Sequence, residues 1–252
     1  MAYVNLVHTD SSNGSNTANI ILYPNKSGYD DDVCDGSIAS AVDSGFDVLT
    51  SNDLLGEYNV YKYETSNYPA FDNSSTSYSQ LGSEWVDWLD NNSDYWPSKN
   101  GCHMLVASDY KDSGGPASTD YNRDNFDIDQ KSDCGFNTSQ AMLLGLYNAH
   151  TYKEKHENFA IQEPLHTFIP EDYIKNNTSL FDSNDPEEHQ LGYVTSAGRA
   201  TPMLTGHAGS DDWYHNEEGL GECRTDWKWE EGHIKVLTSC TKEAMYKTAN
   251  NA

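Results

Sequence analysis

Short apolar runs separated by polar stretches dominate the first half of the chain. Residues 18–23 and 103–108 have the length and composition of buried strands. Residues 46–49 and 57–63 carry aromatic and β-branched side chains, which favour strands as well. Residues 142–147 are apolar throughout and fit either a strand or a helix. The pattern therefore predicts a sheet built from several short strands.

Apolar residues at helical spacing predict helices among these strands. One of these helices ends at Gly45, because glycine is a good C-terminal stop. Another is capped by Ser83 or its neighbours. The expected segments are residues 35–44, 83–89 and 157–169, and residues 234–248 combine a short strand with a final helix that opens near Ser239 or Thr241.

Strands and helices alternate through the first half, and the order becomes irregular afterwards. This order predicts an α/β fold with a mixed, mostly parallel sheet, packed helices and a loop-rich C-terminal part. No linker long enough to separate domains is present. We therefore expect a single domain over residues 1–252, with a sheet-and-helix part at 1–156 and a second part at 157–252.

Charge adds a strong constraint, since 40 acidic and 15 basic residues give a net charge of −25. Such a chain repels itself at ordinary ionic strength, and molar salt screens the repulsion. Acidic residues are spread along the whole chain, which indicates a solvated surface adapted to high salt. The alternatives are a generic acidic protein or a calcium binder that uses Asp30 to Asp32 or the loop at 182–188.

The same charge argues against a nucleic-acid partner or an anionic membrane surface, because both are polyanions. No apolar run approaches the roughly 20 residues that a transmembrane helix needs, so we expect no membrane insertion. The stretch after Met1 does not resemble a cleavable signal peptide. Export would then require a signal that has been removed, or another route such as release with a virion.

Five cysteines are present, and none forms a CxxC pair, which argues against a zinc ribbon. In an oxidising compartment we expect two disulfides, Cys223–Cys240 and Cys102–Cys134. Each would stabilise the fold by about 3 to 4 kcal/mol. The alternative is a set of reduced, buried cysteines in a cytosolic protein.

Acceptor motifs for N-linked glycans, Asn-X-Ser/Thr, recur along the chain. In a chain so rich in Asn, Ser and Thr many of them arise by chance. They agree with an exported protein without establishing one. The acceptors are Asn13, Asn25, Asn73, Asn91, Asn137, Asn176 and Asn177.

The predicted helix at 157–169 carries the sequence Gln162-Glu163-Pro164-Leu165-His166. It is followed by Glu188-His189-Gln190-Leu191-Gly192 and by Thr201-Pro202-Met203-Leu204. In order and content these motifs resemble the metzincin clan of zinc metallopeptidases, of a secreted and salt-adapted archaeal type. The first motif is a degenerate HExxH in which Gln162 replaces the first His.

The resemblance implies a role for several residues. Two His at i and i+4 on one helical face hold Zn²⁺, and the Glu between them acts as a general base toward the metal-bound water. Glu163 then corresponds to the base and His166 to the second metal ligand. His189 corresponds to a third ligand, and His207 is a replacement for the ligand lost at Gln162.

The sequence departs from the clan at several points. A Gln carbonyl is a poor zinc ligand. Ile169 and Asp172 stand where the clan has a Gly and a third His. Pro164 is tolerated at the first position of a helix but costs about 3 kcal/mol in the interior. If the helix begins at Pro164, then Gln162 and His166 need not share a face.

Structural roles are the alternatives for these residues. His166 is also consistent with a core histidine, His189 with a surface or second-layer partner of Glu188, and Met203 with a packed turn. Two functions follow. The first is zinc-dependent hydrolysis of a peptide or protein substrate outside the cell. The second is an inactive surface, adhesion or virion protein that reuses the same fold, since many Tyr and Trp side chains suit recognition.

Overall fold

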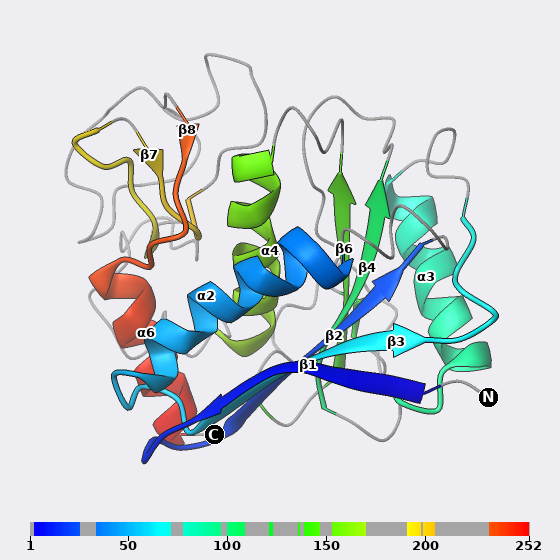
Figure 1. Ribbon diagram of the computed structural model, residues 1–252, viewed down its shortest axis with the longest axis horizontal. Helices are drawn as coiled ribbons and strands as arrows, with labels where there is room; N and C mark the ends of the chain where they lie inside the picture. The colour runs from blue at the N-terminus through cyan, green and yellow to red at the C-terminus, as the bar shows by residue number, and fades with distance from the viewer. Residues whose placement is uncertain are drawn as a thin grey trace.

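The computed structural model describes residues 3–25, 34–71, 78–96, 100–108, 121–122, 136, 139–146, 153–169, 191–197, 199–204 and 232–251. Its centre is a six-stranded sheet in the order β1-β3-β2-β4-β6-β5 (Figure 1). The strands are β1 (Tyr3–Ser11), β2 (Thr17–Pro24), β3 (Glu57–Glu64), β4 (Gly101–Ser108), β5 (Tyr121–Asn122) and β6 (Ser139–Leu146).

The inner strands of this sheet are parallel. β2 pairs in parallel with β3 and β4, and β4 pairs in parallel with β6. The two outer strands, β1 and β5, are antiparallel to their neighbours. The predicted α/β class with a mixed, mostly parallel sheet is confirmed, and so are strands at 18–23, 57–63 and 103–108. The ambiguous run at 142–147 is part of strand β6 over residues 142–146, and residue 147 lies outside the described residues.

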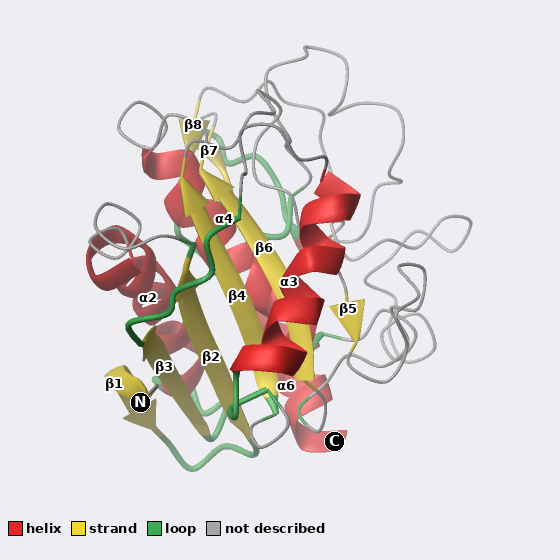
Figure 2. Ribbon diagram, turned by 90° about the vertical axis from the view of Figure 1, so that its right-hand side faces the viewer, coloured by secondary structure: helices red, strands yellow, loops and turns green. Residues whose placement is uncertain are grey.

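Helices cover both faces of the sheet. α3 (Tyr78–Asn92) lies on one face, and α2 (Ala39–Thr50), α4 (Lys153–Phe168) and α6 (Ser239–Asn251) lie on the other (Figure 2). Alternate residues of β2 follow this division, because Ile20 and Leu22 belong to the core beneath α2 and α4, and Ile21 and Tyr23 to the core beneath α3. Strands buried on both faces need continuous apolar runs, which is why the sequence revealed them.

Two predictions in the α2 region are wrong. The helix does not stop at Gly45 but continues to Thr50, so residues 46–49 are helical and form no strand. A short π-helical turn, η1 (Cys34–Ile38), precedes it. The reason is packing, because a Cβ at Gly45 would lie 2.6 Å from Cγ2 of Ile161 on α4. Gly45 therefore allows a close helix–helix approach and does not act as a cap.

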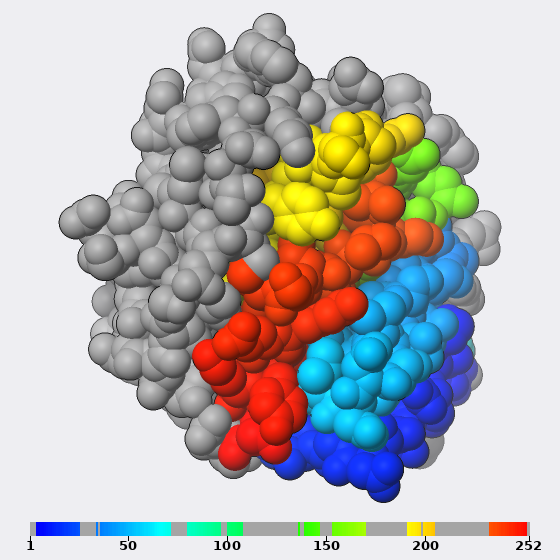
Figure 3. Space-filling view, turned by 90° about the vertical axis from the view of Figure 1, so that its left-hand side faces the viewer, coloured from blue at the N-terminus to red at the C-terminus, as the bar shows by residue number. Residues whose placement is uncertain are grey.

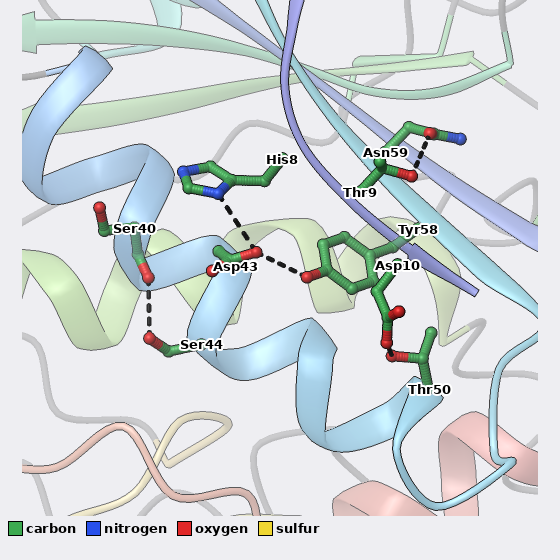
Figure 4. Close-up of polar contacts among 9 residues, drawn as sticks. All are labelled: His8, Thr9, Asp10, Ser40, Asp43, Ser44, Thr50, Tyr58 and Asn59. Atoms are coloured by element: carbon green, nitrogen blue, oxygen red, sulfur yellow. Dashed lines mark hydrogen bonds and ion pairs between the residues drawn. The ribbon is translucent and has the colours of Figure 1, made fainter. Parts of the chain in front are cut away.

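Polar contacts hold α2 against β1 and β3 (Figure 4). The Asp43 carboxylate on α2 accepts a hydrogen bond from the Tyr58 hydroxyl at 2.6 Å and lies 3.4 Å from Nδ1 of His8. At the end of the helix the Thr50 hydroxyl donates to Asp10 at 2.7 Å. The antiparallel edge strand is thus fixed to the helical layer by side chains as well as by its own ladder.

The C-terminal part lies against the exposed side of the helical layer. The short parallel strands β7 (Arg199–Ala200) and β8 (Gly232–His233) form a second sheet. In the space-filling view, α6 lies between this second sheet and two loops, the one that leads into β2 and the one that follows α2 (Figure 3). The predicted strand at the start of 234–248 is wrong, because the strand there, β8, ends at His233 and residues 234–238 are irregular, whereas the final helix begins at Ser239 as expected.

Cysteines divide between buried thiols and a disulfide. Cys34 and Cys102 are buried and form no disulfide, so the predicted Cys102–Cys134 bond is wrong. Cys102 lies inside β4, where its side chain belongs to the core shared with α2 and α4. Cys240 is disulfide-bonded. Cys134 and Cys223 lie outside the described residues, and the Cys223–Cys240 bond stays a prediction.

Among the described residues, none of the helices combines the length and the apolar character that crossing a bilayer requires.

Candidate functional site

Helix α4 is the most enclosed helix of the fold. Every residue from Asn158 to Phe168 is buried, although polar side chains outnumber apolar ones along the helix. It contacts α2, β4 and β6 on one side and β8 and α6 on the other. The structure begins this helix at Lys153, four residues before the predicted start at residue 157.

The second half of α4 buries a cluster of polar side chains. Gln162, Glu163 and Thr167 are fully buried, and His166 is 5% exposed. Removing an amide, a carboxyl and an imidazole from water costs several kcal/mol unless each finds a partner. A helix that only packed would carry apolar residues here. The burial of this cluster therefore identifies it as the candidate site.

Gln162 and His166 share one face of the helix. The Nε2 atoms of the two side chains lie 3.4 Å apart, across one helical turn. Pro164 lies within the helix, and α4 continues through it to Phe168. The alternative in which the helix begins at Pro164 is therefore wrong, and the i, i+4 spacing places the two side chains together as the sequence motif implies.

The amide of Gln162 is directed at the imidazole. With the amide nitrogen as donor, the Nε2 lone pair of His166 is the acceptor, and Nε2 is the atom that would otherwise bind a metal. The Gln162 Oε1 atom is buried and has no hydrogen-bond partner among the described residues. Zinc prefers imidazole nitrogen and thiolate sulfur to an amide oxygen. The α4 residues therefore do not fit the zinc site of the clan.

The remaining predicted ligands cannot be placed. His189 and His207 lie outside the described residues, as do both predicted calcium segments, Asp30 to Asp32 and residues 182–188. Within the part of the chain that the structure describes, no group of three or more His, Cys, Asp or Glu side chains is arranged to hold a metal ion. Whether His189 and His207 join His166 stays a prediction.

Met203 occupies a buried turn. Its φ of +64° lies in the left-handed region, which is uncommon for a residue with a long side chain. The side chain is fully buried in the same core as Leu165 and Phe168 of α4. Backbone conformations of this kind cost of order 1–3 kcal/mol and persist where packing enforces them. The alternative interpretation of Met203 as a packed turn is therefore confirmed.

Close backbone contacts hold this turn in place. A Cβ at Gly192 would lie 2.3 Å from the backbone nitrogen of Leu204 and 2.4 Å from the carbonyl carbon of Met203. Leu191 O also accepts hydrogen bonds from the hydroxyls of Thr238 and Thr241 at the start of α6. The segments at 191–192, 203–204 and 238–241 therefore form one packed unit beside α4.

Asn158 was not predicted as a site residue, but it fixes the position of α4. Its Nδ2 atom donates to the carbonyl oxygens of Ala200 at 3.1 Å and Ile234 at 2.7 Å. One buried amide thus joins the helix to strand β7 and to the residue after β8. The signal in the sequence was an Asn at the i−4 position of Gln162, and an Asn in a helix carries no specific pattern.

His156 lies one and a half turns before Gln162 and is also buried. Burial, followed by the nearby charges of Lys155 and His233, lowers the pKa of His156 to about 4. Its Nδ1 atom has no hydrogen-bond partner among the described residues. At neutral pH the ring is therefore uncharged, and α4 meets β8 through a neutral imidazole.

Ion pairs lie around the contact between α4 and β8. Glu154 binds the Arg199 guanidinium at 2.8 Å, and Glu157 lies 3.1 Å from Nζ of Lys235 and 3.6 Å from Nζ of Lys153. Exposed pairs of this kind each contribute about 0–1 kcal/mol. They orient the first half of α4 against β7 and the segment after β8, and the buried Asn158 amide provides the more specific anchor.

Comparison of the chain with protein-family models, curated proteins and solved structures finds no match. The candidate function therefore depends on the α4 geometry and on the order of the elements around it.

Proposed function

We propose that this chain is a surface-associated binding protein built on a metallopeptidase-type framework, with α4 in the place of the catalytic helix. The observation that carries the proposal is the contact between Gln162 and His166, whose Nε2 atoms are 3.4 Å apart. In a zinc peptidase the corresponding helix offers two imidazoles to a metal. Here an amide bonds the single imidazole directly, so a metal must first displace a hydrogen bond.

The order of elements supports the framework. A mostly parallel sheet with an antiparallel strand at the β5 edge leads from β6 into α4. A buried turn at Met203 follows, packed against the core that contains α4. This is the arrangement that the degenerate motif at Gln162 to His166 and the Thr201 to Leu204 motif predict for a metzincin-like protein. The likeness is one of element order and three short motifs.

The amino-acid composition supports a surface location in high salt and a protein or peptide partner. A net charge of −25 suits a protein that functions in high salt, outside the cell or on a cell or virion surface. The same charge disfavours nucleic acid as a partner. Seventeen Tyr and six Trp provide side chains that suit recognition of a peptide or protein surface. The proposed partner is therefore a protein or peptide and not a polyanion.

Metal analysis and proteolysis assays test this proposal. The protein is purified in high salt and its zinc and calcium contents are measured, and casein hydrolysis is followed with and without a chelator. We expect less than stoichiometric zinc and no chelator-sensitive cleavage. The Glu163→Gln variant is the matched control, since it removes the carboxylate with little change in volume. Cleavage that is lost both with chelator and in Glu163→Gln overturns the proposal.

The second candidate is a zinc-dependent peptidase. The observation that favours it is the full burial of Glu163 together with His166, three residues later on the same helix. In this alternative His166, His189 and His207 would hold the metal, and Glu163 would act as the general base. Zinc at one equivalent per chain, lost on changing any of the three His to Ala, would establish this alternative in place of the first.

A further inference from the structure

The N-glycan acceptor motifs that the structure describes differ in burial and in hydrogen bonding. Three acceptors, Asn13, Asn25 and Asn91, lie among the described residues. Asn25 is fully buried, and its side-chain amide exchanges two hydrogen bonds with the backbone of Phe71, at 2.9 and 3.1 Å. A sugar on this nitrogen would replace one of its two hydrogens and would have no space at a fully buried side chain. Asn25 therefore has a structural role, joining the end of β2 to the segment after β3.

Asn91 is exposed, but its side-chain amide is hydrogen-bonded. It lies in the last turn of α3, and its Nδ2 atom donates to the carbonyl oxygen of Asp87 at 2.6 Å. The hydroxyl of the motif, on Ser93, is also engaged, since its Oγ lies 3.2 Å from the Tyr23 hydroxyl and accepts from the Trp96 backbone nitrogen. Both polar groups of this motif are thus used by the fold.

Asn13 differs from both. It lies in the loop between β1 and β2, its side chain is exposed, and no side-chain hydrogen bond of Asn13 occurs within the described part of the chain. Its backbone nitrogen donates to Asp53 at 3.1 Å. The neighbouring residue Ser12 is fixed, since its backbone nitrogen donates to Gly56 O and its hydroxyl to Leu55 O, both at 2.7 Å.

The other end of this loop is fixed as well. Ser15 O accepts from the backbone nitrogen of Gly56 at 2.8 Å, and the Asn16 side chain donates to Ala249 O on α6. In Figure 1 the loop between β1 and β2 lies beside the C-terminal end of α6. The loop is therefore held on both sides of Asn13 and presents the acceptor amide to solvent.

The hydroxyl of the motif is held by one weak contact. Ser15 Oγ donates to Oδ1 of Asn250 at 3.1 Å, between two solvent-accessible side chains. A hydrogen bond between two solvent-accessible side chains contributes little, because water competes for both groups. The Ser15 hydroxyl can therefore leave Asn250 at small cost to meet a transferase.

We propose that Asn13 is an N-glycosylation site. The side-chain amide nitrogen of Asn13 forms a bond to C1 of the sugar of a polyprenyl-phosphate-linked oligosaccharide. The bond from C1 to the phosphate oxygen breaks, the lipid phosphate leaves, and the amide proton passes to a base of the transferase. The proposal requires the extracellular or surface location of the proposed function, and it does not depend on the state of the α4 site.

Expression with an added export signal, in a host that performs N-glycosylation, tests this site. Export is then supplied by the signal, so the result does not depend on the native location. Peptide mapping of the secreted protein by mass spectrometry should find a glycan on the Asn13 peptide. The Asn13→Gln and Ser15→Ala variants should each lose that glycan entirely, and Ser15→Thr should keep it.

Asn250→Ala provides a further test of the geometry. It frees the Ser15 hydroxyl, so the occupied fraction at Asn13 should equal or exceed that of the parent protein. A folded, secreted protein without a glycan at Asn13 overturns the proposal, and so does a glycan on Asn25 or Asn91 with Asn13 unmodified. Zinc content and casein hydrolysis, measured on the same preparations, report the proposed function separately.

Discussion

The side chains of Gln162 and His166 meet across one turn of α4, with their Nε2 atoms 3.4 Å apart. This relationship makes a gain of metal affinity testable with a single change. Gln162→His places two imidazoles at i and i+4 on one helical face, which is a zinc-binding arrangement. A ligand at 100 times its Kd stabilises the folded state by about 2.7 kcal/mol.

We therefore expect zinc to raise the Tm of Gln162→His by several degrees, whereas the parent protein shows a smaller shift. Calorimetry in high salt with and without zinc measures the difference. Gln162→His combined with His166→Ala serves as the control, because it keeps only one imidazole at this pair of positions. Equal zinc-induced shifts in the single variant and this double variant would show that the two positions do not cooperate.

His156 predicts a loss of stability in acid. Its pKa in the folded protein is about 4, below the ordinary value of 6.5, because burial and then Lys155 and His233 disfavour the charged ring. The unfolded chain therefore binds more protons than the folded one between these two pH values. The stability is complete above pH 6.5 and falls as the pH decreases toward 4, by up to about 3 kcal/mol.

Denaturant titrations at a series of pH values measure this effect through the free energy of unfolding. His156→Gln removes the titrating group and should flatten the profile between pH 6.5 and 4. His8→Gln is the comparison, since His8 lies near Asp43 at the surface and is 30% exposed. A profile of unchanged slope in His156→Gln would assign the acid sensitivity to other groups.

Gly192 predicts a strong steric effect on the turn at Met203. A Cβ at this position would lie 2.3 Å from a backbone atom of Leu204, and the backbone cannot move aside as a flexible side chain can. Gly192→Ala should lower the free energy of unfolding by about 3 kcal/mol. Gly36→Ala is the matched control, because a Cβ there would meet nothing within 4 Å.

Urea denaturation of the two alanine variants checks this prediction. The Gly36→Ala variant should have a free energy of unfolding within about 1 kcal/mol of the parent, shifted toward greater stability because alanine suits a helical turn better than glycine. If Gly192→Ala were as stable as Gly36→Ala, the tight contact between residues 191–192 and 203–204 would be incorrect.

Net charge predicts a dependence of stability on salt. The Debye length falls from about 10 Å at 0.1 M salt to about 3 Å at 1 M, which screens the repulsion among 40 acidic side chains. We expect the Tm to rise by roughly 10 °C over this range, equivalent to about 3 kcal/mol. Sucrose at matched osmolality is the control, since it favours the compact state without screening charge. Equal rises in salt and sucrose would argue against salt adaptation.

Elements with strong local patterns could be predicted from the sequence. β2 and β4 are buried on both faces and therefore read as continuous apolar runs. β1 was missed because it is an edge strand with many polar residues. The Asn5 side chain donates to Glu64 at 2.6 Å, and the Thr9 hydroxyl donates to Asn59 at 2.9 Å. Polar residues of this kind bond across the β1–β3 pair, so β1 lacks the alternation of apolar and polar residues that would mark a strand in the sequence.

Gly45 and Pro164 show why helix boundaries could not be predicted. Each residue has a local preference to end or begin a helix, and in each case tertiary packing overrides that preference. Gly45 is required for the approach of Ile161, and Pro164 is retained in a helix that is buried on all sides from Asn158 to Phe168. A single sequence contains no information on which of these competing effects is larger.

The candidate site was predictable in its local part only. The i, i+4 spacing of Gln162 and His166 follows from helical geometry, so the sequence could place these two side chains together. The Asn158 contacts to Ala200 and Ile234 join segments that are 42 and 76 residues apart. Contacts of that separation depend on the whole fold, and no local pattern reports them.

The pairing of the first loop with the last helix has a consequence for biosynthesis. Ser15 and Asn250, which share a hydrogen bond, are 235 residues apart, and Asn16 and Ala249 are 233 residues apart. The contacts of this loop with α6 therefore form only after residues 249 and 250 have been synthesised. Contacts of such long sequence separation form slowly, so the β1–β2 loop acquires its α6 partners late in folding.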